Sequence, residues 1–370
     1  MAKRVYLLFL TVLAPVLLIF LFLKAVLPST DDDYYKESFL NHYGIYAVPI
    51  PVEIDFAGER VPLEEGDILE RLDRELLVNT YWQSNTLLYI KRANRWFPVF
   101  EPILAANGIP DDFKYVALIE SGLMNVVSPA GAAGFWQFLA TTAREYGLEV
   151  NDFVDERYHV EKATQAACRY FLDGYRRFGN WTLAAAGYNM GNAGVSRQMG
   201  TQMQNCYHDL HLNEETSRYI FRILAVKHIL ENPARSGFHF REKDLYKPLQ
   251  YRTITVDRPI ANLAQFALDN GTNYKTLRLL NPWVRSNELP NRSGIRYELN
   301  FRSGNFSTHY HFSRLYEPGR TFKFNKHRDS FAQAEKPSGR VVQTHSIHSA
   351  KRRQANEAPA YLARLRVVLR

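Results

Sequence analysis

The sequence predicts a mainly α-helical protein that carries a small α+β module near its C-terminus and a membrane-spanning helix at its N-terminus. Three observations support this fold class. Apolar residues recur at three- and four-residue spacing between residues 67 and 232, as they do in amphipathic helices. Residues 251–301 then combine two strand-like stretches with two short helical patterns, and a run of nineteen uncharged residues lies near the N-terminus.

The composition indicates a folded protein without a basic face for nucleic acid. Of the 370 residues, 46% are hydrophobic and 23% are charged, which excludes a mainly disordered or collagen-like chain. The formal net charge is +8, but residues 326–370 alone hold ten Lys and Arg against three Asp and Glu. Because this polar tail carries nearly all of the excess charge, we expect no nucleic-acid partner. The tail itself is predicted to be disordered.

The N-terminal segment predicts membrane insertion and export. Val5–Leu23 contains nineteen residues without a charge, and two basic residues precede it. About 18 uncharged apolar residues suffice to span a bilayer, whereas the core of a secretory signal has about 7–15. We interpret residues 1–28 as an anchor whose basic head stays cytoplasmic, with a long cleaved signal peptide as the alternative. Residues 29–66 are predicted to form a stalk with one short strand around Val52–Phe56.

Residues 67–235 are predicted to form an all-helical domain. Almost no alternating strand pattern occurs in this block, and its loops contain several glycines. Asn232-Pro233 marks the end of the last helix, because the residue before a proline disfavours helical backbone. The five expected helices are Ile68–Val78, Leu87–Phe100, Phe113–Ile119, Ala163–Tyr175 and Tyr219–Ile229.

Residues 236–325 are predicted to hold a linker and a module of about fifty residues. The expected order is strand, helix, helix, strand, over Arg252–Val256, Ile260–Leu268, Tyr274–Leu280 and Arg296–Asn300. A unit of this size is typical of a small binding module.

Glu120 is the candidate catalytic residue. It follows the apolar residues Val116–Ile119 and precedes Ser121 and Gly122, a glycine that can close a helix. A carboxyl at the end of an apolar helix face is poorly solvated, so its pKa should rise, as a general acid at neutral pH requires. An ordinary surface glutamate at a helix end fits the same seven residues, so both interpretations stay open.

The segment Ser128–Phe138 indicates a sugar-binding turn. Three small residues precede Gly134, and Phe135 and Trp136 stand beside a single amide side chain, Gln137. Aromatic faces stack on sugar rings, while an amide can fix hydroxyl or acetamido groups. A helix N-terminus with core aromatics is the alternative.

Two further stretches place polar residues at helix ends. Leu183–Gly187 predicts a helix of small residues that delivers Tyr188 and Asn189 into a glycine-rich turn. Asn213–Tyr219 predicts a helix start with acidic residues in its first turn. Asn189 could be only a helix cap, and Tyr219 could be a core residue or a hydrogen-bond donor into a cleft.

In this order and at these separations, the four stretches resemble the lytic transglycosylases of bacterial cell walls, particularly the membrane-bound type D enzymes. The resemblance runs from about residue 79 to residue 229. The module at 251–301 is similar to a LysM-type glycan-binding unit, with Asp257-Arg-Pro in place of the expected Gly-Asp-Thr. The matching motifs are Ile119–Gly122, Gly134–Gln137, Gly187–Gly191 and Glu215–Tyr219, with Gly187 where many members have alanine.

The resemblance implies a lysozyme-like helical domain that cleaves the β-1,4 bond between N-acetylmuramic acid and N-acetylglucosamine without water. Glu120 would protonate the leaving oxygen and then act as a base toward the muramic-acid C6 hydroxyl, whose attack gives a 1,6-anhydro ring. Ser121 would orient Glu120 or a substrate oxygen. The residues expected to hold the N-acetyl groups and to support the oxocarbenium charge are Gln137, Tyr188, Asn189 and Tyr219.

The same resemblance implies a place in the cell envelope. The protein would be anchored in the inner membrane with periplasmic domains, or released into the periplasm if the N-terminal segment is cleaved. Its partners would be peptidoglycan glycan strands and, through the N-terminal helix, the membrane, and we expect a monomer. We expect neither a cofactor nor a metal, because the pairs His208 and His211, and His309 and His311, have no third ligand nearby.

The remaining polar and sulfur-containing residues leave alternatives open. Asp152, Asp155 and Glu156 lie in a polar loop and are predicted to be solvated, so the substrate would have to supply the nucleophile that a second carboxylate provides in ordinary glycosidases. A hydrolytic muramidase of the same fold and a non-catalytic wall-binding protein are the alternative functions. Cys168 is predicted to be a buried thiol, and a bridge to Cys206 stays open.

Overall fold

The computed structural model describes residues 13, 15, 46–291 and 294–302. Apart from residues 13 and 15, the predicted anchor lies outside the described residues, as do residues 29–45 of the stalk and the whole tail at 326–370. Within the part of the chain that is described, no helix is both long enough and apolar enough to cross a bilayer. The chain divides into two units at residue 50, and the described residues of the second unit contain the helical domain and the C-terminal module.

The second unit confirms the mainly helical fold, with two small sheets. All five predicted helices are present, with ends that differ from the predicted ones by at most six residues, and the last one ends at Glu231, directly before Asn232. The α-helices before the module are α3 (Gly66–Tyr81), α4 (Gln83–Ala106), α5 (Lys114–Ser121), α6 (Ala140–Glu145), α7 (Val160–Phe178), α8 (Trp181–Met190), α9 (Asn192–Gln202) and α10 (Glu214–Glu231). Single 3-10 turns are η1 (Asp111–Phe113), η2 (Glu156–Tyr158), η3 (Tyr207–Asp209), η4 (Pro233–Ser236) and η5 (Glu242–Asp244).

Two helices, α6 and α9, were not predicted from the sequence, whereas α8 is the helix of small residues expected at Leu183–Gly187. Each buries very little: Ala143 is the only buried residue of α6, and Gly194 and Val195 are the only ones of α9. A helix that buries one or two small residues lacks an apolar stripe, so its sequence carries almost no periodic signal.

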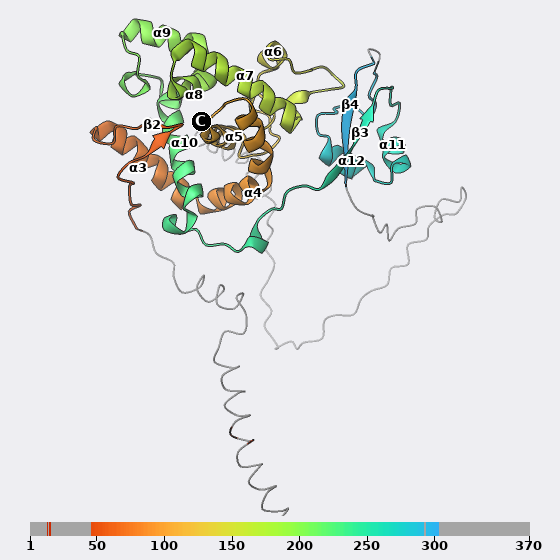
Figure 1. Ribbon diagram of the computed structural model, residues 1–370, viewed down its shortest axis with the longest axis horizontal. Coiled ribbons are helices and arrows are strands. Elements are labelled where there is room, and N and C mark those ends of the chain that lie inside the picture. The colour runs from red at the N-terminus through yellow and green to blue at the C-terminus, as the bar shows by residue number, and fades with distance from the viewer. Residues whose placement is uncertain (1–12, 14, 16–45, 292–293, 303–370) are drawn as a thin grey trace, which may run out of the picture. The chain divides into compact units, whose positions relative to one another are not determined.

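The helix α5 lies in the middle of the helical domain, where Figure 1 shows it surrounded by the other helices. It packs against α4 and α10, and its residues 115–119 are all buried. Next to it is a set of fully or almost fully buried aromatic rings whose centroids lie 4.4–6.0 Å apart; its members are Phe100, Phe113, Phe135, Trp136 and Phe171. Packed aromatic pairs of this kind stabilise a core beyond the area that they bury.

A short β-hairpin inside the predicted stalk is packed into the helical domain. Strand β1 (Asp55–Phe56) pairs antiparallel with β2 (Glu59–Arg60), and Phe56 is fully buried against Phe113. Glu59 accepts hydrogen bonds from the backbone nitrogens of Trp181 and Thr182 at 2.6 and 2.9 Å, where its negative charge meets the positive end of α8. The packed unit therefore begins before residue 67, with strands too short to show an alternating pattern.

The glycine at position 187 has a local structural reason. A β-carbon there would overlap the side-chain oxygen of Asn192, which also lies within 3.3 Å of the β-carbon position of Gly174. The two glycines therefore make room for the Asn192 side chain between α7 and α8. An alanine at position 187 would require Asn192 to move.

The C-terminal module has the predicted strand, helix, helix, strand order. Its elements are β3 (Tyr251–Val256), α11 (Leu263–Asp269), α12 (Tyr274–Leu280) and β4 (Tyr297–Arg302). The two strands pair antiparallel, with Tyr251 opposite Arg302 and Val256 opposite Tyr297. Both helices begin at an asparagine whose side chain accepts backbone hydrogen bonds, Asn262 for α11 and Asn273 for α12.

Gly134 provides a stability test. It has a φ of +80°, and an added β-carbon would overlap the backbone carbonyl oxygen of Arg157. Gly131 has a φ of +81° with open space around it, so it is the matched control. Both alanine variants bear the same backbone strain of about 1 kcal/mol, and only Gly134→Ala adds a steric overlap of about 1–3 kcal/mol. We expect thermal unfolding to show a clearly lower Tm for Gly134→Ala than for Gly131→Ala; equal Tm values would contradict the close contact.

Candidate active site

Glu120 lies at the C-terminal end of α5, where the helix stops at Gly122. Gly122 adopts a left-handed conformation with a φ of +61°, and its backbone nitrogen donates to the carbonyl of Leu118. The last carbonyls of a helix carry a partial negative charge, which disfavours an ionised carboxylate nearby. The sequence therefore delivers a carboxyl to a place where its neutral form is favoured.

The pKa of Glu120 is raised to about 7, mainly because burial disfavours the charged carboxylate. The charge of Glu215 acts in the same direction, whereas a hydrogen bond from Tyr219 and the positive charge of Arg222 oppose the rise. Glu120 as a whole is only half-buried, because part of its surface still reaches solvent. The carboxyl group itself, where the charge resides, is enclosed by protein.

Tyr219 approaches Glu120 from α10. Its hydroxyl donates a 2.6 Å hydrogen bond to Oε1 of Glu120, and its side chain is 1% exposed. Burial and the nearby Glu120 charge hold the pKa of Tyr219 well above its ordinary value, so the hydroxyl keeps its proton and remains a donor. The structure thus brings together two residues that lie 99 positions apart in the sequence.

Tyr188 lies near the same carboxyl, at the C-terminal end of α8. Burial and the charge of Glu120 raise its pKa well above the ordinary value. Its hydroxyl donates a 2.6 Å hydrogen bond to the backbone carbonyl of Trp136. In this structure Tyr188 therefore fixes the turn before Gln137.

Ser121 faces protein backbone. It is 6% exposed, and its hydroxyl lies 2.8 Å from the carbonyl oxygen of Phe135 and 3.0 Å from that of Ala117. These contacts tie the end of α5 to the turn at Phe135. The geometry supports a role for Ser121 in positioning the segment that carries Glu120.

Gln137 is held in a strained turn, with a φ of +50°. Its amide nitrogen donates to the carbonyls of Gly134 and Val126 at 2.7 and 3.1 Å. These bonds use the nitrogen of the amide, so its oxygen is the atom left to meet a ligand. Strained backbone of this kind is common at functional sites.

The aromatic residues of this turn are core residues, contrary to the sugar-stacking interpretation. Phe135 is 2% exposed and Trp136 is fully buried, with its indole nitrogen donating to Thr164. Their faces pack on neighbouring rings, including those of Phe100 and Phe171, and so are closed to a sugar. The sequence pattern could not separate the two roles, because packing and stacking favour the same residue types.

Asn189 is fixed by residues at the start of α10. Its side-chain oxygen accepts a 2.7 Å hydrogen bond from the hydroxyl of Thr216, which is 1% exposed. Its amide nitrogen lies 3.5 Å from Oε1 of Glu215. Neither Thr216 nor Glu215 was selected as a site residue from the sequence, although both lie within the fourth motif. The only sequence signal for these two residues was a threonine next to an acidic residue near a helix start.

Two carboxylates expected to be solvated are buried instead. Asp155 and Glu156 are 7% and 5% exposed, while Asp152 is exposed as predicted. Asp155 forms a two-bond ion pair with Arg157, and Glu156 pairs with Lys162 and accepts from the backbone nitrogen of Glu149 at 2.8 Å. Both carboxylates are therefore occupied by structural partners.

The two cysteines are free thiols. Cys168 is fully buried on α7, as predicted, and burial raises its thiol pKa to about 12. Cys206 is half-buried and unbridged. His309 and His311 lie outside the described residues. Within the described ranges, no group of three or more His, Cys, Asp or Glu side chains is arranged to hold a metal ion.

Two family models match the chain. Residues 99–209 match the transglycosylase SLT domain, a range that includes Glu120, Gln137, Tyr188 and Asn189. Residues 252–301 match the C-terminal LysM-like domain of soluble lytic transglycosylases, which coincides with the observed module.

Curated proteins and a solved structure give further similarities. The membrane-bound lytic murein transglycosylase D of Escherichia coli K12, and that of Escherichia coli O6:H1, are each 27% identical to this chain over 251 residues. The match covers 65% of this chain and 54% of each relative, so the chain spans about half the length of these proteins. An inactive mutant of the lytic transglycosylase Slt from Pseudomonas aeruginosa shares 17% identity at a TM-score of 0.30, over 41% of this chain and 26% of that one.

The matched ranges fall on the two parts that the structure defines, the helices around Glu120 and the four-element module. The chain therefore contains an SLT transglycosylase domain followed by a LysM-like domain, and it is homologous to membrane-bound lytic murein transglycosylase D.

Proposed function

We propose that this protein is a lytic transglycosylase that cleaves peptidoglycan glycan strands at the bond between N-acetylmuramic acid and N-acetylglucosamine. The observation that carries the proposal is the enclosed Glu120 carboxyl, with its raised pKa and its hydrogen bond from Tyr219, inside a domain that matches the SLT model. The proposal includes a location in the cell envelope, with the segment at residues 1–28 as anchor and a monomeric enzyme.

The first step needs an acid that holds its proton at neutral pH. With a pKa of about 7, Glu120 is protonated in roughly half of the molecules at that pH. Tyr219 donates to Oε1, so Oε2 is the oxygen that can carry the proton to the leaving glycosidic oxygen. Once the proton is transferred, the same hydrogen bond stabilises the new carboxylate.

The second step needs a nucleophile for the anomeric carbon. The buried carboxylates Asp155 and Glu156 are already paired, and Glu215 is exposed at the start of α10. The C6 hydroxyl of the muramic acid therefore attacks C1 as the bond from C1 to the leaving oxygen breaks. The hydroxyl proton passes to the Glu120 carboxylate, which restores the acid, and no water is consumed.

The other polar groups are proposed to hold the substrate. Thr216 fixes the orientation of the Asn189 amide, which suits binding of an acetamido group. Gln137 offers its amide oxygen from a rigid turn. Tyr188 and Ser121 contribute by fixing the backbone around Trp136 and Phe135.

Product analysis tests the reaction. Wild-type protein digesting purified peptidoglycan should release anhydro products, which mass spectrometry finds lighter than hydrolysis products by one water. Glu120→Gln should lower the rate by at least about 100-fold, because the amide cannot donate a proton as an acid does. Glu70→Gln, on an exposed position of α3, is the matched control and should keep the wild-type rate. Reducing-end products would indicate a muramidase, and an active Glu120→Gln would leave Glu120 without a catalytic role.

The pH dependence of the rate follows from the pKa of Glu120. With soluble glycan fragments, kcat/KM should fall about tenfold per pH unit above a pH of about 7, as the acid loses its proton. In Tyr219→Phe the hydrogen bond that lowers this pKa is lost, so the fall in kcat/KM, the basic limb of the pH profile, should move to higher pH. The maximal rate should also fall. A limb that stays in place in Tyr219→Phe would show that Glu120 is not the group being titrated.

The same pKa predicts a pH-dependent stability difference. Glu120 binds its proton more tightly in the folded protein than in the unfolded chain, so its contribution is fully present below about pH 4.5 and is lost as the pH rises through about 7. The loss is on the order of 3 kcal/mol once Glu120 is ionised. Glu120→Gln has no such term, so urea unfolding at pH 5 and pH 8 should show the variant gaining stability relative to wild type as the pH rises. No relative gain would contradict the enclosed carboxyl.

A further inference from the structure

We infer that the LysM-like module is a structural brace for the turn beside Glu120, in addition to any glycan that it binds. We call residues 131–138 the active-site turn and residues 149–158 the bridging segment. The module packs on the bridging segment, and the bridging segment holds the active-site turn. The consequence for catalysis rests on the proposed function, whereas the contacts stand by themselves.

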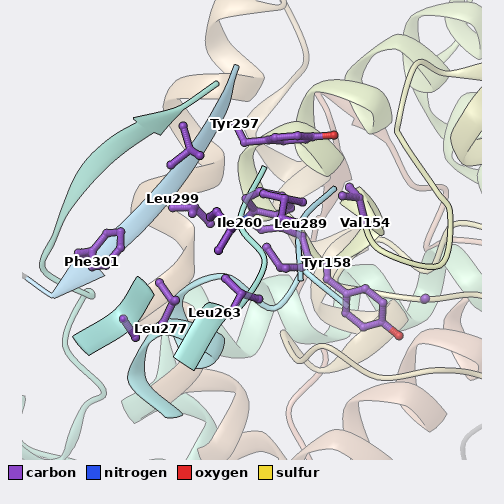
Figure 2. Close-up of a cluster of buried hydrophobic side chains, with 14 residues drawn as sticks. Val154, Tyr158, Ile260, Leu263, Leu277, Leu289, Tyr297, Leu299 and Phe301 are labelled. Carbon is purple, nitrogen blue, oxygen red and sulfur yellow. The ribbon is translucent and has the colours of Figure 1, made fainter. Parts of the chain in front are cut away.

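The module and the bridging segment share one hydrophobic cluster. Val154 and Tyr158 lie among module side chains, as Figure 2 shows, and Ala133 of the active-site turn belongs to the same cluster. Val154 forms a β-bridge with Val284, and both are 1% exposed. An interface that buries apolar residues this fully and also pairs backbone is expected to be stable rather than transient.

Backbone hydrogen bonds fix the bridging segment to the loop between α12 and β4. The nitrogen of Asp155 donates to the carbonyl of Trp283 at 2.8 Å, and the nitrogen of Arg285 donates to the carbonyl of Phe153 at 2.7 Å. These two bonds flank the bridge at Val154. The module therefore sets the backbone position of Asp155 directly.

Side chains add contacts around this backbone pairing. The hydroxyl of Tyr297 donates to Glu149 at 3.0 Å, and the guanidinium of Arg285 lies 4.3 Å from the ring centre of Tyr158. Nearby on α7, Glu161 accepts a 2.9 Å hydrogen bond from the hydroxyl of Tyr251.

The linker before the module is also attached to the helical domain. Asn94 and Arg95 of α4 donate to the backbone carbonyls of Tyr246 and Lys247 at 3.1 and 3.0 Å. The Arg95 guanidinium lies 5.1 Å from the ring centre of Tyr246. The linker between α10 and β3 is thus attached to α4 shortly before the module begins.

The bridging segment holds the active-site turn through Arg157. Asp155 grips the guanidinium of Arg157 with bonds of 2.9 and 2.7 Å, and both side chains are about one-tenth exposed. Held in this way, Arg157 donates to the carbonyls of Gly131 and Phe138 at 2.9 and 3.1 Å, one at each end of the turn. Gly134, in the middle of the turn, lies against the carbonyl of Arg157 itself. We assign Arg157 as a positioning residue.

The active-site turn in turn touches the groups around Glu120. The carbonyl of Phe135 accepts from Ser121, the neighbour of Glu120, and the carbonyl of Trp136 accepts from Tyr188. Every link from Trp283 to Ser121 is therefore a hydrogen bond or a direct backbone neighbour. A small shift of the bridging segment would therefore change the surroundings of the Glu120 carboxyl.

The buried edge of the module argues against a purely tethering role. The loop between α12 and β4 carries Trp283 and Val284, which are 3% and 1% exposed. Val284 and Trp283 reach the bridging segment, so this edge is closed to a glycan. A module that only bound glycan at the end of a free linker would not need this buried contact with the bridging segment.

Hydrogen exchange in the full-length protein tests the brace without relying on activity. Val284→Asp places a charge in the shared cluster, whereas Leu279→Asp makes the same change on α12 at a side chain that is 66% exposed. The reporting amides are those of Ala133 and Gly134, which bond to the carbonyls of Phe138 and Val126. We expect at least about tenfold faster exchange of these amides in Val284→Asp and wild-type exchange in Leu279→Asp.

A second variant keeps the test valid if Val284→Asp unfolds the module. The double variant Arg285→Ala and Tyr297→Phe removes the groups that reach Tyr158 and Glu149 and keeps the buried apolar side chains of the module. Inside the module it removes one hydrogen bond, from Arg285 to the carbonyl of Pro282. Protection of the β3 and β4 amides reports that the module is folded. Faster exchange in the active-site turn with β3 and β4 still protected supports the brace. The brace is overturned if the amides of the active-site turn exchange at the wild-type rate in both interface variants. It is also overturned if they do so in a variant whose module is unfolded.

Activity on short soluble glycan fragments gives a separate readout. If the module is a brace, both interface variants should cleave these fragments more slowly than wild type does, by the same factor as on intact peptidoglycan. The basic limb of their pH profile should move to lower pH, because Glu120 becomes more solvated. A module that only tethers glycan would slow the reaction on intact peptidoglycan alone. If wild type shows no cleavage, the proposed function fails while the exchange result still decides the brace.

Discussion

The enclosure of one carboxyl group is the constraint on which the rest of the site depends. Glu120 ends a buried helix, and its charged form is disfavoured both by burial and by the helix C-terminus. The Tyr219 hydroxyl and the Arg222 charge keep the pKa near 7 rather than higher. The acid is therefore poised between its two protonation states, as a group that gives up a proton and later accepts one should be.

This balance requires a rigid surrounding, and the structure provides it through side chains that bind backbone. Ser121, Tyr188 and Arg157 all place their polar atoms on carbonyls of the active-site turn. Polar residues near a catalytic group are easily taken for substrate ligands. Here Ser121 and Tyr188 satisfy the carbonyls of the buried residues Phe135 and Trp136, which would otherwise be costly to leave unpaired.

The sequence predicted most of the helices, the module and the candidate acid because each leaves a local pattern. The apolar face of α5 ends at Glu120, and β3 through β4 follow the expected order with shifts of at most three residues. The burial of Phe135 and Trp136, and of Asp155 and Glu156, could not be predicted in this way. Their partners, such as Phe171 and Lys162, are brought near only by the fold. The short strand expected around Val52–Phe56 contains β1, whereas its partner β2 was not predicted, because a two-residue strand has no period to detect.

The polar loop after the second motif shows how far such a partner can lie from the residue that needs it. Asp155 is read locally as a solvated acid, yet it is buried because Trp283 and Val284, about 130 positions away, cover its segment. Its charge is then balanced by Arg157, whose remaining donors reach both ends of the active-site turn. Burial of the loop by the module and order in the turn are therefore linked through this ion pair, in addition to the contacts of Ala133 and Gly134. A buried pair of this kind contributes mainly through the geometry that it fixes, since removing either partner leaves an uncompensated charge.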